Sequence, residues 1–165
     1  MFAVDTNVLV HAADPGSPFH APCAGALARW RTERAPWFVT WSVLYEFVRL
    51  VTHPRKMRRP VTIQQAWSGV EALLASPTLR VLVATERHAD VARAVFEETP
   101  GLTGNLAHDA HIAILMREHG IRRIYTRDAD FFRFPFLEPI DPVRPAAAPG
   151  TAEPIARYRG SKKSR

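Results

Sequence analysis

The chain has 165 residues, of which 47% are hydrophobic and 23% charged, a composition typical of one ordinary globular domain. The net charge is +6, and most of it lies near the C-terminus: residues 146–165 hold five Lys or Arg residues and one Glu, a net +4, which leaves +2 for residues 1–145. A single cysteine excludes an intramolecular disulfide, and no apolar run approaches membrane-spanning length.

Short β-like runs alternate with helical stretches along the chain, which is typical of a parallel α/β sheet. Strands are predicted at 1–4, 37–40, 80–84, 121–126 and 136–138. Helices are predicted at about 17–34, 42–52, 62–76, 85–99 and 105–119. Their expected N-caps are Ser17, Ser42, Thr62, Thr85 and Asn105. Thr62 and Gln65 also have the spacing of a capping box, and Phe96 falls on the apolar stripe of its helix.

The two ends of the chain bear on its location and on its domain boundary. The N-terminus has no basic region before its short apolar stretch, so we expect no secretion signal and a cytoplasmic location, without a membrane partner. We expect one domain over residues 1–141, followed by a Pro- and Ala-rich and then basic tail with little order over 142–165.

A basic cluster also interrupts the body of the chain, at Arg55, Lys56, Arg58 and Arg59. Basic clusters of this kind suit a polyanionic partner such as RNA. The alternative is that the cluster is a solvated loop and the tail a disordered end.

Acidic side chains recur near strand ends and helix starts. Asp5 directly follows the first strand and Asp128 follows the fourth by two residues, whereas Glu46 and Asp109 lie about one turn into helices. The carboxyl ends of parallel strands gather at one edge of a sheet, where ligands bind. Glu46 and Asp109 also interrupt apolar helix stripes, a costly position for a carboxylate that has no partner.

Each of these acids has a structural explanation when it is taken singly. Asp5 and Asp128 suit turn caps, and the helix dipole favours Asp109 near a helix start. Taken together, the acids favour an oxygen-ligand site for Mg²⁺ or Mn²⁺, a solution suited to phosphodiester cleavage. The sequence has no Gly-rich phosphate loop, which argues against an NTPase, and its histidines lack zinc-motif spacing.

Four stretches of the chain resemble the PIN domain, and most closely the small bacterial toxins of the VapC type. They are FAVDTNVLV at 2–10, SVLYEFVRL at 42–50, NLAHDAHIA at 105–113 and YTRDADF at 125–131. Their order and spacing span about 130 residues and leave only the tail unmatched. The resemblance implies a three-layer α/β/α fold around a parallel sheet of four to five strands, and a Mg²⁺- or Mn²⁺-dependent endoribonuclease.

The resemblance also implies roles for single residues. The acidic quartet that binds metal and carries out catalysis would be Asp5, Glu46, Asp109 and Asp128. Supporting positions beside the quartet would be Asn7, Asn105, Thr126 and Asp130, with direct metal contact by the last less favoured. We expect RNA to meet the basic cluster, and the family resemblance adds a cognate antitoxin and a second copy of the chain as partners.

Two other functions remain open at this point. One is a PIN nuclease of RNA processing or decay that has no antitoxin, and the other is a non-catalytic RNA-binding module that uses the basic cluster and tail. Aromatic residues leave a similar choice: Trp30, Trp37, Trp41 and Trp67 suit the core or an interface. The aromatic run at 131–136 suits packing beneath the site, a partner contact or stacking on RNA bases.

Overall fold

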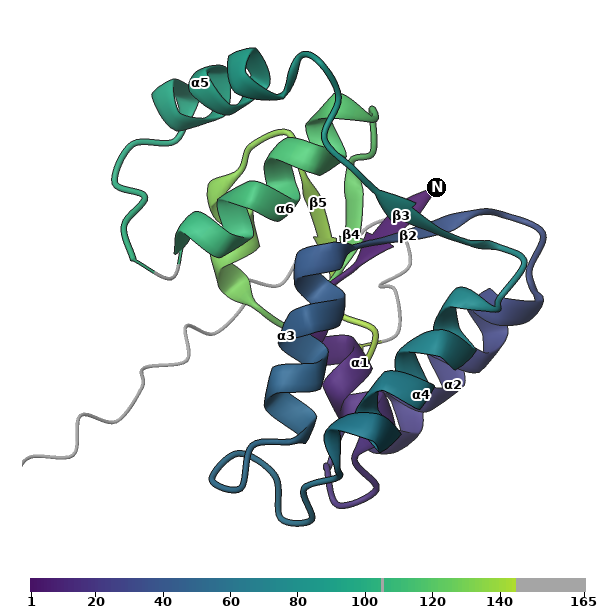
Figure 1. Cartoon of the computed structure of the whole chain (residues 1–165). Coiled ribbons are helices and arrows are strands. Elements are labelled where there is room, and N and C mark those ends of the chain that lie inside the picture. Colours follow the sequence, from purple (N-terminus) through teal and green to yellow (C-terminus); the bar gives the residue numbers. More distant parts are fainter. Residues whose placement is uncertain (105, 145–165) are drawn as a thin grey trace, which may run out of the picture.

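The computed structural model of the chain describes residues 1–104 and 106–144. In this part of the chain, five strands form one parallel sheet with the order β3-β2-β1-β4-β5 (Figure 1). The strands are β1 (Phe2–Val4), β2 (Trp37–Thr40), β3 (Leu79–Leu82), β4 (Arg123–Tyr125) and β5 (Glu138–Ile140). The sheet confirms the predicted α/β fold class, although β5 begins two residues later than predicted.

Helices flank the sheet in three α/β/α layers (Figure 1). They are α1 (Thr6–Ala13), α2 (His20–Thr32), α3 (Trp41–Val51), α4 (Ile63–Leu74), α5 (His88–Glu98) and α6 (Leu106–Glu118), and a short 3₁₀ helix, η1 (Ala129–Arg133), follows β4. α1 packs against both α2 and α3, α3 packs against α4, and α5 lies along α6. Among the described helices, none has the length and apolar character needed to cross a membrane.

The start of α4 confirms the predicted capping box. Thr62 Oγ1 accepts a hydrogen bond from Gln65 N at 3.2 Å, and Gln65 Oε1 accepts one from Thr62 N at 2.9 Å. These two bonds satisfy donors that a helix start leaves without a partner. Asn105, the predicted cap of α6, and residues 145–165, which make up most of the predicted tail, lie outside the described residues.

Two predicted serine caps are wrong because nearby groups engage their hydroxyls. Ser17 Oγ accepts from Phe19 N and lies 2.9 Å from His11 Nδ1, and α2 begins three residues later, at His20. At the start of α3, Thr40 accepts the capping bond from Val43 N, while the Ser42 hydroxyl only meets Thr40 Oγ1 at 2.7 Å.

The third wrong cap, Thr85, is explained by a buried acid. Glu118 of α6 has a side chain with no solvent exposure, and it accepts hydrogen bonds from Thr85 N at 2.9 Å and Thr85 Oγ1 at 2.5 Å. His88 Nδ1 lies 2.7 Å from the other oxygen of Glu118. Because a buried carboxylate needs such partners, the threonine serves α6 and α5 begins at His88.

The core joins α2 to the centre of the sheet through aromatic rings. The Trp30 ring is buried with its centroid 5.0 Å from that of Phe2 on β1 and 4.5 Å from that of Tyr125 on β4. Trp37 is also buried, so both tryptophans confirm the core reading, whereas 41% of Trp41 is exposed. Phe96 was predicted to face the core, but it is 52% exposed. The reason is that α5 packs mainly against one element, the helix α6.

The Trp30 cluster generates a stability prediction. We expect Trp30→Ala to lower the free energy of unfolding by about 3–5 kcal/mol, because it leaves a cavity between α2, β1 and β4. Trp41→Ala is the matched control, since its ring is partly in solvent and its loss should cost well under half as much. Urea denaturation followed by circular dichroism measures both, and equal losses would contradict the packing described here.

Candidate active site

A groove of about 910 Å³ opens where β1 ends and α1 begins, between α3 and the first turn of α6. It brings together all four acids of the predicted quartet. The residues that line it are Asp5, Thr6, Asn7, Ser42, Tyr45, Glu46, Arg49, Leu50, Lys56, His108, Asp109 and Asp128. The elements that meet here are far apart in sequence, so the sheet order places the acids side by side.

Asp5 is the most buried of the four acids, with 6% of the residue exposed. It is the N-cap of α1, and its Oδ1 accepts a hydrogen bond from Thr6 N at 2.6 Å. Its Oδ2 accepts two more, from Asn7 Nδ2 at 2.5 Å and from Thr126 Oγ1 at 2.7 Å. These three neutral donors hold the carboxylate in one orientation without cancelling its charge.

Thr126 and Asn7 fasten the ends of β1 and β4 to each other. The Thr126 hydroxyl donates to Asp5 and accepts from Asp128 N at 2.9 Å and from Asn7 Nδ2 at 3.1 Å. Asn7 Oδ1 accepts from Arg127 N at 3.1 Å. The two side chains therefore set the path of the chain toward Asp128, and the supporting role expected of them stays a prediction.

Three carboxylates form the tightest acidic group in the described residues. Asp109, Asp128 and Asp130 each offer one oxygen, and these oxygens all lie within 4.8 Å of one another. Asp128 caps η1 by accepting from Asp130 N at 2.9 Å, which turns the chain so that Asp130 returns to the group. Asp130, which the sequence placed in a supporting position, is therefore as close to the centre as two members of the quartet.

Glu46 lies in the same groove but has basic side chains as neighbours. Thr6 Oγ1 donates to Glu46 Oε2 at 3.0 Å, and Arg49 Nη2 donates to Glu46 Oε1 at 3.0 Å. His108 Nε2 lies 3.1 Å from Oε2, within ion-pair range but outside hydrogen-bond geometry. Glu46 is therefore paired with a cation, whereas Asp5 and Asp109 have no ion-pair partner among the described residues.

Two acids that have no cation partner, Asp5 and Asp109, have strongly raised pKa values. Burial raises the pKa of Asp5 to about 7, the hydrogen bonds from Thr126 and Thr6 oppose the rise, and the charges of Asp109 and Asp128 add to it. Burial likewise raises the pKa of Asp109 to about 7, helped by the charges of Asp128, Asp130 and Glu46. A cation bound beside such carboxylates stabilises their ionised form.

The donor set fits a hard divalent cation. The three oxygens that lie within 4.8 Å of one another come from carboxylates, which Mg²⁺ and Mn²⁺ prefer. Burial first, and then the charges of neighbouring acids, raise the pKa of Asp5 and of Asp109. In the described part of the chain, neither Asp5 nor Asp109 has an ion-pair partner. A bound divalent cation would supply a charge partner for Asp5 and Asp109 and would favour the ionised form of both carboxylates.

The predicted basic cluster contributes one residue to the groove. Lys56 lines it, whereas Arg55, Arg58 and Arg59 are exposed in the loop between α3 and α4 and are not among the lining residues. Arg49, which was not predicted, is the second basic residue in the lining. Its signal was present in the sequence, because a cation three residues after a glutamate on one helix faces that glutamate.

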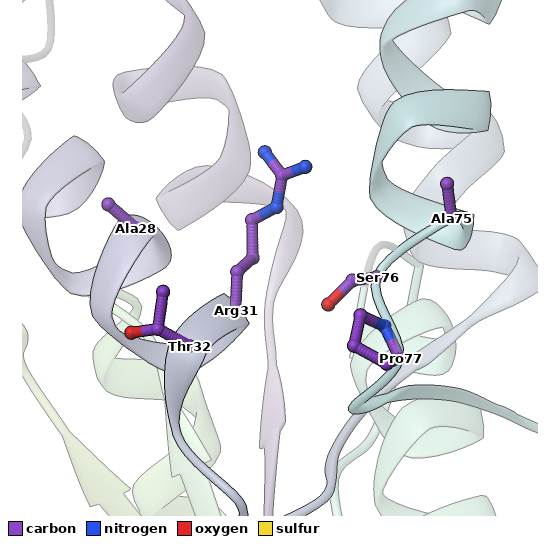
Figure 2. A pocket seen from close by; sticks show the side chains of 6 residues that line it. All are labelled: Ala28, Arg31, Thr32, Ala75, Ser76 and Pro77. Atoms are coloured by element: carbon purple, nitrogen blue, oxygen red, sulfur yellow. The ribbon is translucent and has the colours of Figure 1, made fainter.

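A second hollow lies at the C-terminal ends of α2 and α4 (Figure 2). It has a volume of about 400 Å³, and Arg31, its one charged lining residue, donates a hydrogen bond to Ala72 O at 3.3 Å. The other lining residues are Ala28, Thr32, Ala75, Ser76 and Pro77. A set without a carboxylate, imidazole or thiol offers no comparable chemistry, so the acidic groove is the candidate site.

Comparison with known families and proteins gives a consistent result. The family model described as "PIN domain" matches residues 2–137. Ribonuclease VapC48 of Mycobacterium tuberculosis (strain H37Rv) is 33% identical over 138 residues, which cover 84% of this chain and 94% of that protein. Ribonuclease VapC43 of the same strain is 36% identical over 134 residues, covering 81% and 90%.

Solved structures share the fold. VapC20 of Mycobacterium tuberculosis, described as a Sarcin-Ricin loop cleaving toxin, superposes with a TM-score of 0.58 at 21% identity and covers 80% of this chain and 93% of its own. VapBC2 from Rickettsia felis, solved bound to a DNA fragment from their promoter, gives a TM-score of 0.60 at 18% identity, with coverage of 84% and 96%. At these identities the likeness concerns the fold.

The raised pKa of Asp109 predicts a pH-dependent stability in the absence of divalent metal. The folded chain holds this proton more tightly than the unfolded chain, whose ordinary value is 3.8, so stability should fall as pH rises from about 4 to above 7. Asp109→Asn removes the charge and should raise the unfolding temperature at pH 8 by about 3–6 °C, or about 1–2 kcal/mol after solvent screening.

At pH 3 the same substitution should change the unfolding temperature little, because Asp109 is then protonated in the folded chain and in the unfolded chain, whose ordinary value is 3.8. Calorimetry in EDTA at the two pH values measures the difference. Asp90→Asn, at an exposed position on α5, is the control that should shift neither value. A stabilisation of equal size at both pH values would show that repulsion among the groove acids is not its cause.

Proposed function

Because this chain belongs to the PIN-domain family, we propose that it is a metal-dependent endoribonuclease that hydrolyses RNA phosphodiester bonds. The single observation that carries the proposal is the convergence of Asp109, Asp128 and Asp130, whose oxygens lie within 4.8 Å of one another. The names of the relatives support the substrate class, since VapC48 and VapC43 are both ribonucleases.

The acids divide into a metal-binding group and a surrounding group. Asp109, Asp128 and Asp130 would hold the Mg²⁺ or Mn²⁺ ion, which supplies activation of a water molecule and neutralisation of the scissile phosphate. Asp5 borders this group closely enough for its pKa to respond to Asp109 and Asp128. Glu46 stands on the side of the groove nearest α3, where it orients water or substrate together with Thr6.

Asp5 has two tasks in this arrangement. Its carboxylate adds negative charge beside the metal-binding group, which strengthens the attraction for a divalent cation. Its fixed orientation, set by donors from Thr6, Asn7 and Thr126, lets it accept a proton from a water without first reorganising. Burial suits this role, because a carboxyl whose pKa is raised to about 7 exchanges protons near neutral pH.

The same groove explains how a polyanion approaches an acidic site. Arg49 and Lys56 line it alongside the carboxylates and would attract the phosphate groups of the RNA. The more distant Arg55, Arg58 and Arg59 are exposed and extend the positive field at the loop after α3. A purely non-catalytic RNA-binding module would have no use for the buried and mutually repelling carboxylates.

We assign the chain to the toxin side of a toxin–antitoxin pair. The relatives carry VapC names, and the solved neighbours include VapBC2 from Rickettsia felis, which shares the fold. A cognate antitoxin would neutralise the enzyme by covering the acidic groove. Homodimer formation stays a prediction of the family resemblance.

The proposal predicts RNA cleavage that depends on Mg²⁺ or Mn²⁺. Asp109→Asn and Asp5→Asn should each lower the rate by roughly 10³-fold, because each removes charge that the cation or the reacting water needs. Asp90→Asn on α5 is the matched control, an acid replaced far from the groove, and should retain full activity. Gel analysis of total RNA with each purified protein measures the rates. Cleavage that persists in EDTA would exclude the metal-dependent reaction.

A further inference from the structure

A row of three aromatic rings leads outward from the acidic groove across α3 and α4. Trp41 and Tyr45 lie one turn apart on α3, with ring centroids 6.2 Å apart. The Trp67 ring of α4 follows at 6.1 Å from Tyr45. The planes of neighbouring rings are tilted by 39° and 33°, and Tyr45 is the middle ring of the row.

Core packing accounts for only part of this row. Tyr45 is 61% exposed and Trp41 is 41% exposed, while Trp67 is only partly buried against the core. The ring area that faces solvent does not stabilise the fold, because only apolar area removed from water does so. Buried rings elsewhere in the molecule, such as Trp30 and Trp37, show how the chain treats aromatics that do serve the core.

The row is continuous with the proposed active site. Tyr45 lines the acidic groove, next in sequence to Glu46. Arg49, one turn after Tyr45 on α3, lines the same groove, as does Lys56 beyond the end of that helix. Aromatic faces next to cations, opening from a catalytic groove, are the two parts of a single-stranded nucleic-acid site: rings for the bases and cations for the phosphates.

The geometry points to a base-stacking platform, made of Trp41, Tyr45 and Trp67, that binds unpaired bases of the substrate RNA next to the scissile phosphate. This inference rests on the proposed ribonuclease function, which it deepens by naming the side chains that bind the bases of the substrate. A base inserted between two rings needs about 7 Å, twice the 3.4 Å stacking rise, so the bases stack on the outward ring faces and not between the rings.

Single-stranded RNA fits this surface better than the alternatives. A duplex keeps its bases stacked inside and offers the rings nothing to contact, whereas an unpaired strand offers a π-face at every nucleotide. A protein segment that docked by apolar contact would have no need of the cations, yet Arg49 and Lys56 line the groove into which the row opens. The ring faces and these cations together match the bases and phosphates of one strand.

The test measures RNA binding separately from cleavage. Each variant is made in an Asp109→Asn background, which blocks the reaction, and is titrated at low salt with a fluorescent 12-nucleotide unstructured RNA and with a 12-base-pair RNA duplex. Tyr45→Ala and Trp67→Ala should each weaken binding of the single strand by about 5- to 100-fold, the range for loss of one stacked base, and leave duplex binding unchanged.

Two further variants serve as controls. Tyr45→Phe keeps the ring and should bind the single strand like the parent protein. Phe96→Ala removes another exposed helical ring, on α5, and should also have no effect. Because Tyr45 is largely in solvent, Tyr45→Ala should keep the parent unfolding temperature, and it decides the test if Trp67→Ala fails to fold.

The outcomes separate this inference from the proposed function. Unchanged single-strand affinity in Tyr45→Ala overturns the platform and points to a protein partner for the row, even if the wild-type chain cleaves RNA. Equal losses for strand and duplex, or no measurable strand binding by the parent, also overturn it. A selective loss supports the platform, and if the wild-type chain then fails to cleave RNA with Mg²⁺ or Mn²⁺, only the nuclease proposal falls.

Discussion

The buried carboxylate of Asp5 is the constraint on which the rest of the site depends. It stands where β1 ends and α1 begins, and burial would make its charge costly if it had no donors. The donors come from both sides of the junction: Thr6 and Asn7 from α1, and Thr126 from the end of β4. Satisfying one carboxylate therefore fixes two strand ends, and the chain that leaves β4 delivers Asp128 to the groove.

This arrangement keeps like charges close together, which costs stability and, in the proposed nuclease, favours binding of a divalent cation. Burial, together with the charges of Asp128, Asp130 and Glu46, raises the pKa of Asp109, so the metal-free fold is less stable above neutral pH. Packing elsewhere offsets that cost, notably where Trp30 closes α2 over β1 and β4. The aromatic rings are likewise of two kinds: some build the core, while Tyr45 is mostly exposed to solvent and Trp41 partly so.

The sequence indicated which acids would lie near one another because strand ends can be predicted from short β-like runs. Asp5 and Asp128 follow such runs, and the parallel order of the sheet brings them to one edge. The position of Asp130 was harder to predict, because it depends on the 3₁₀ turn that Asp128 caps. The surroundings of Glu46 likewise depend on a tertiary partner, Thr6, forty residues away.

Predictions of single helices and caps failed where local sequence preference did not decide the structure. The helix α1 was not predicted, because its eight residues continue an apolar run that periodicity alone cannot assign to strand or helix. Thr85 looked like a cap, but the buried Glu118 of α6 takes its hydroxyl. The capping box at Thr62 was predicted correctly because both of its partners lie within one turn of sequence.

The central claim is that Asp109, Asp128 and Asp130 gather around a divalent cation. The most direct measurement is X-ray diffraction from crystals of the protein grown with Mn²⁺, using the anomalous signal of manganese to locate the ion. The account predicts a peak within coordination distance of oxygens from all three residues, and its loss in crystals of Asp128→Asn. A Mn²⁺-saturated crystal with no peak in the groove, or with a peak that none of these carboxylates touches, would contradict it.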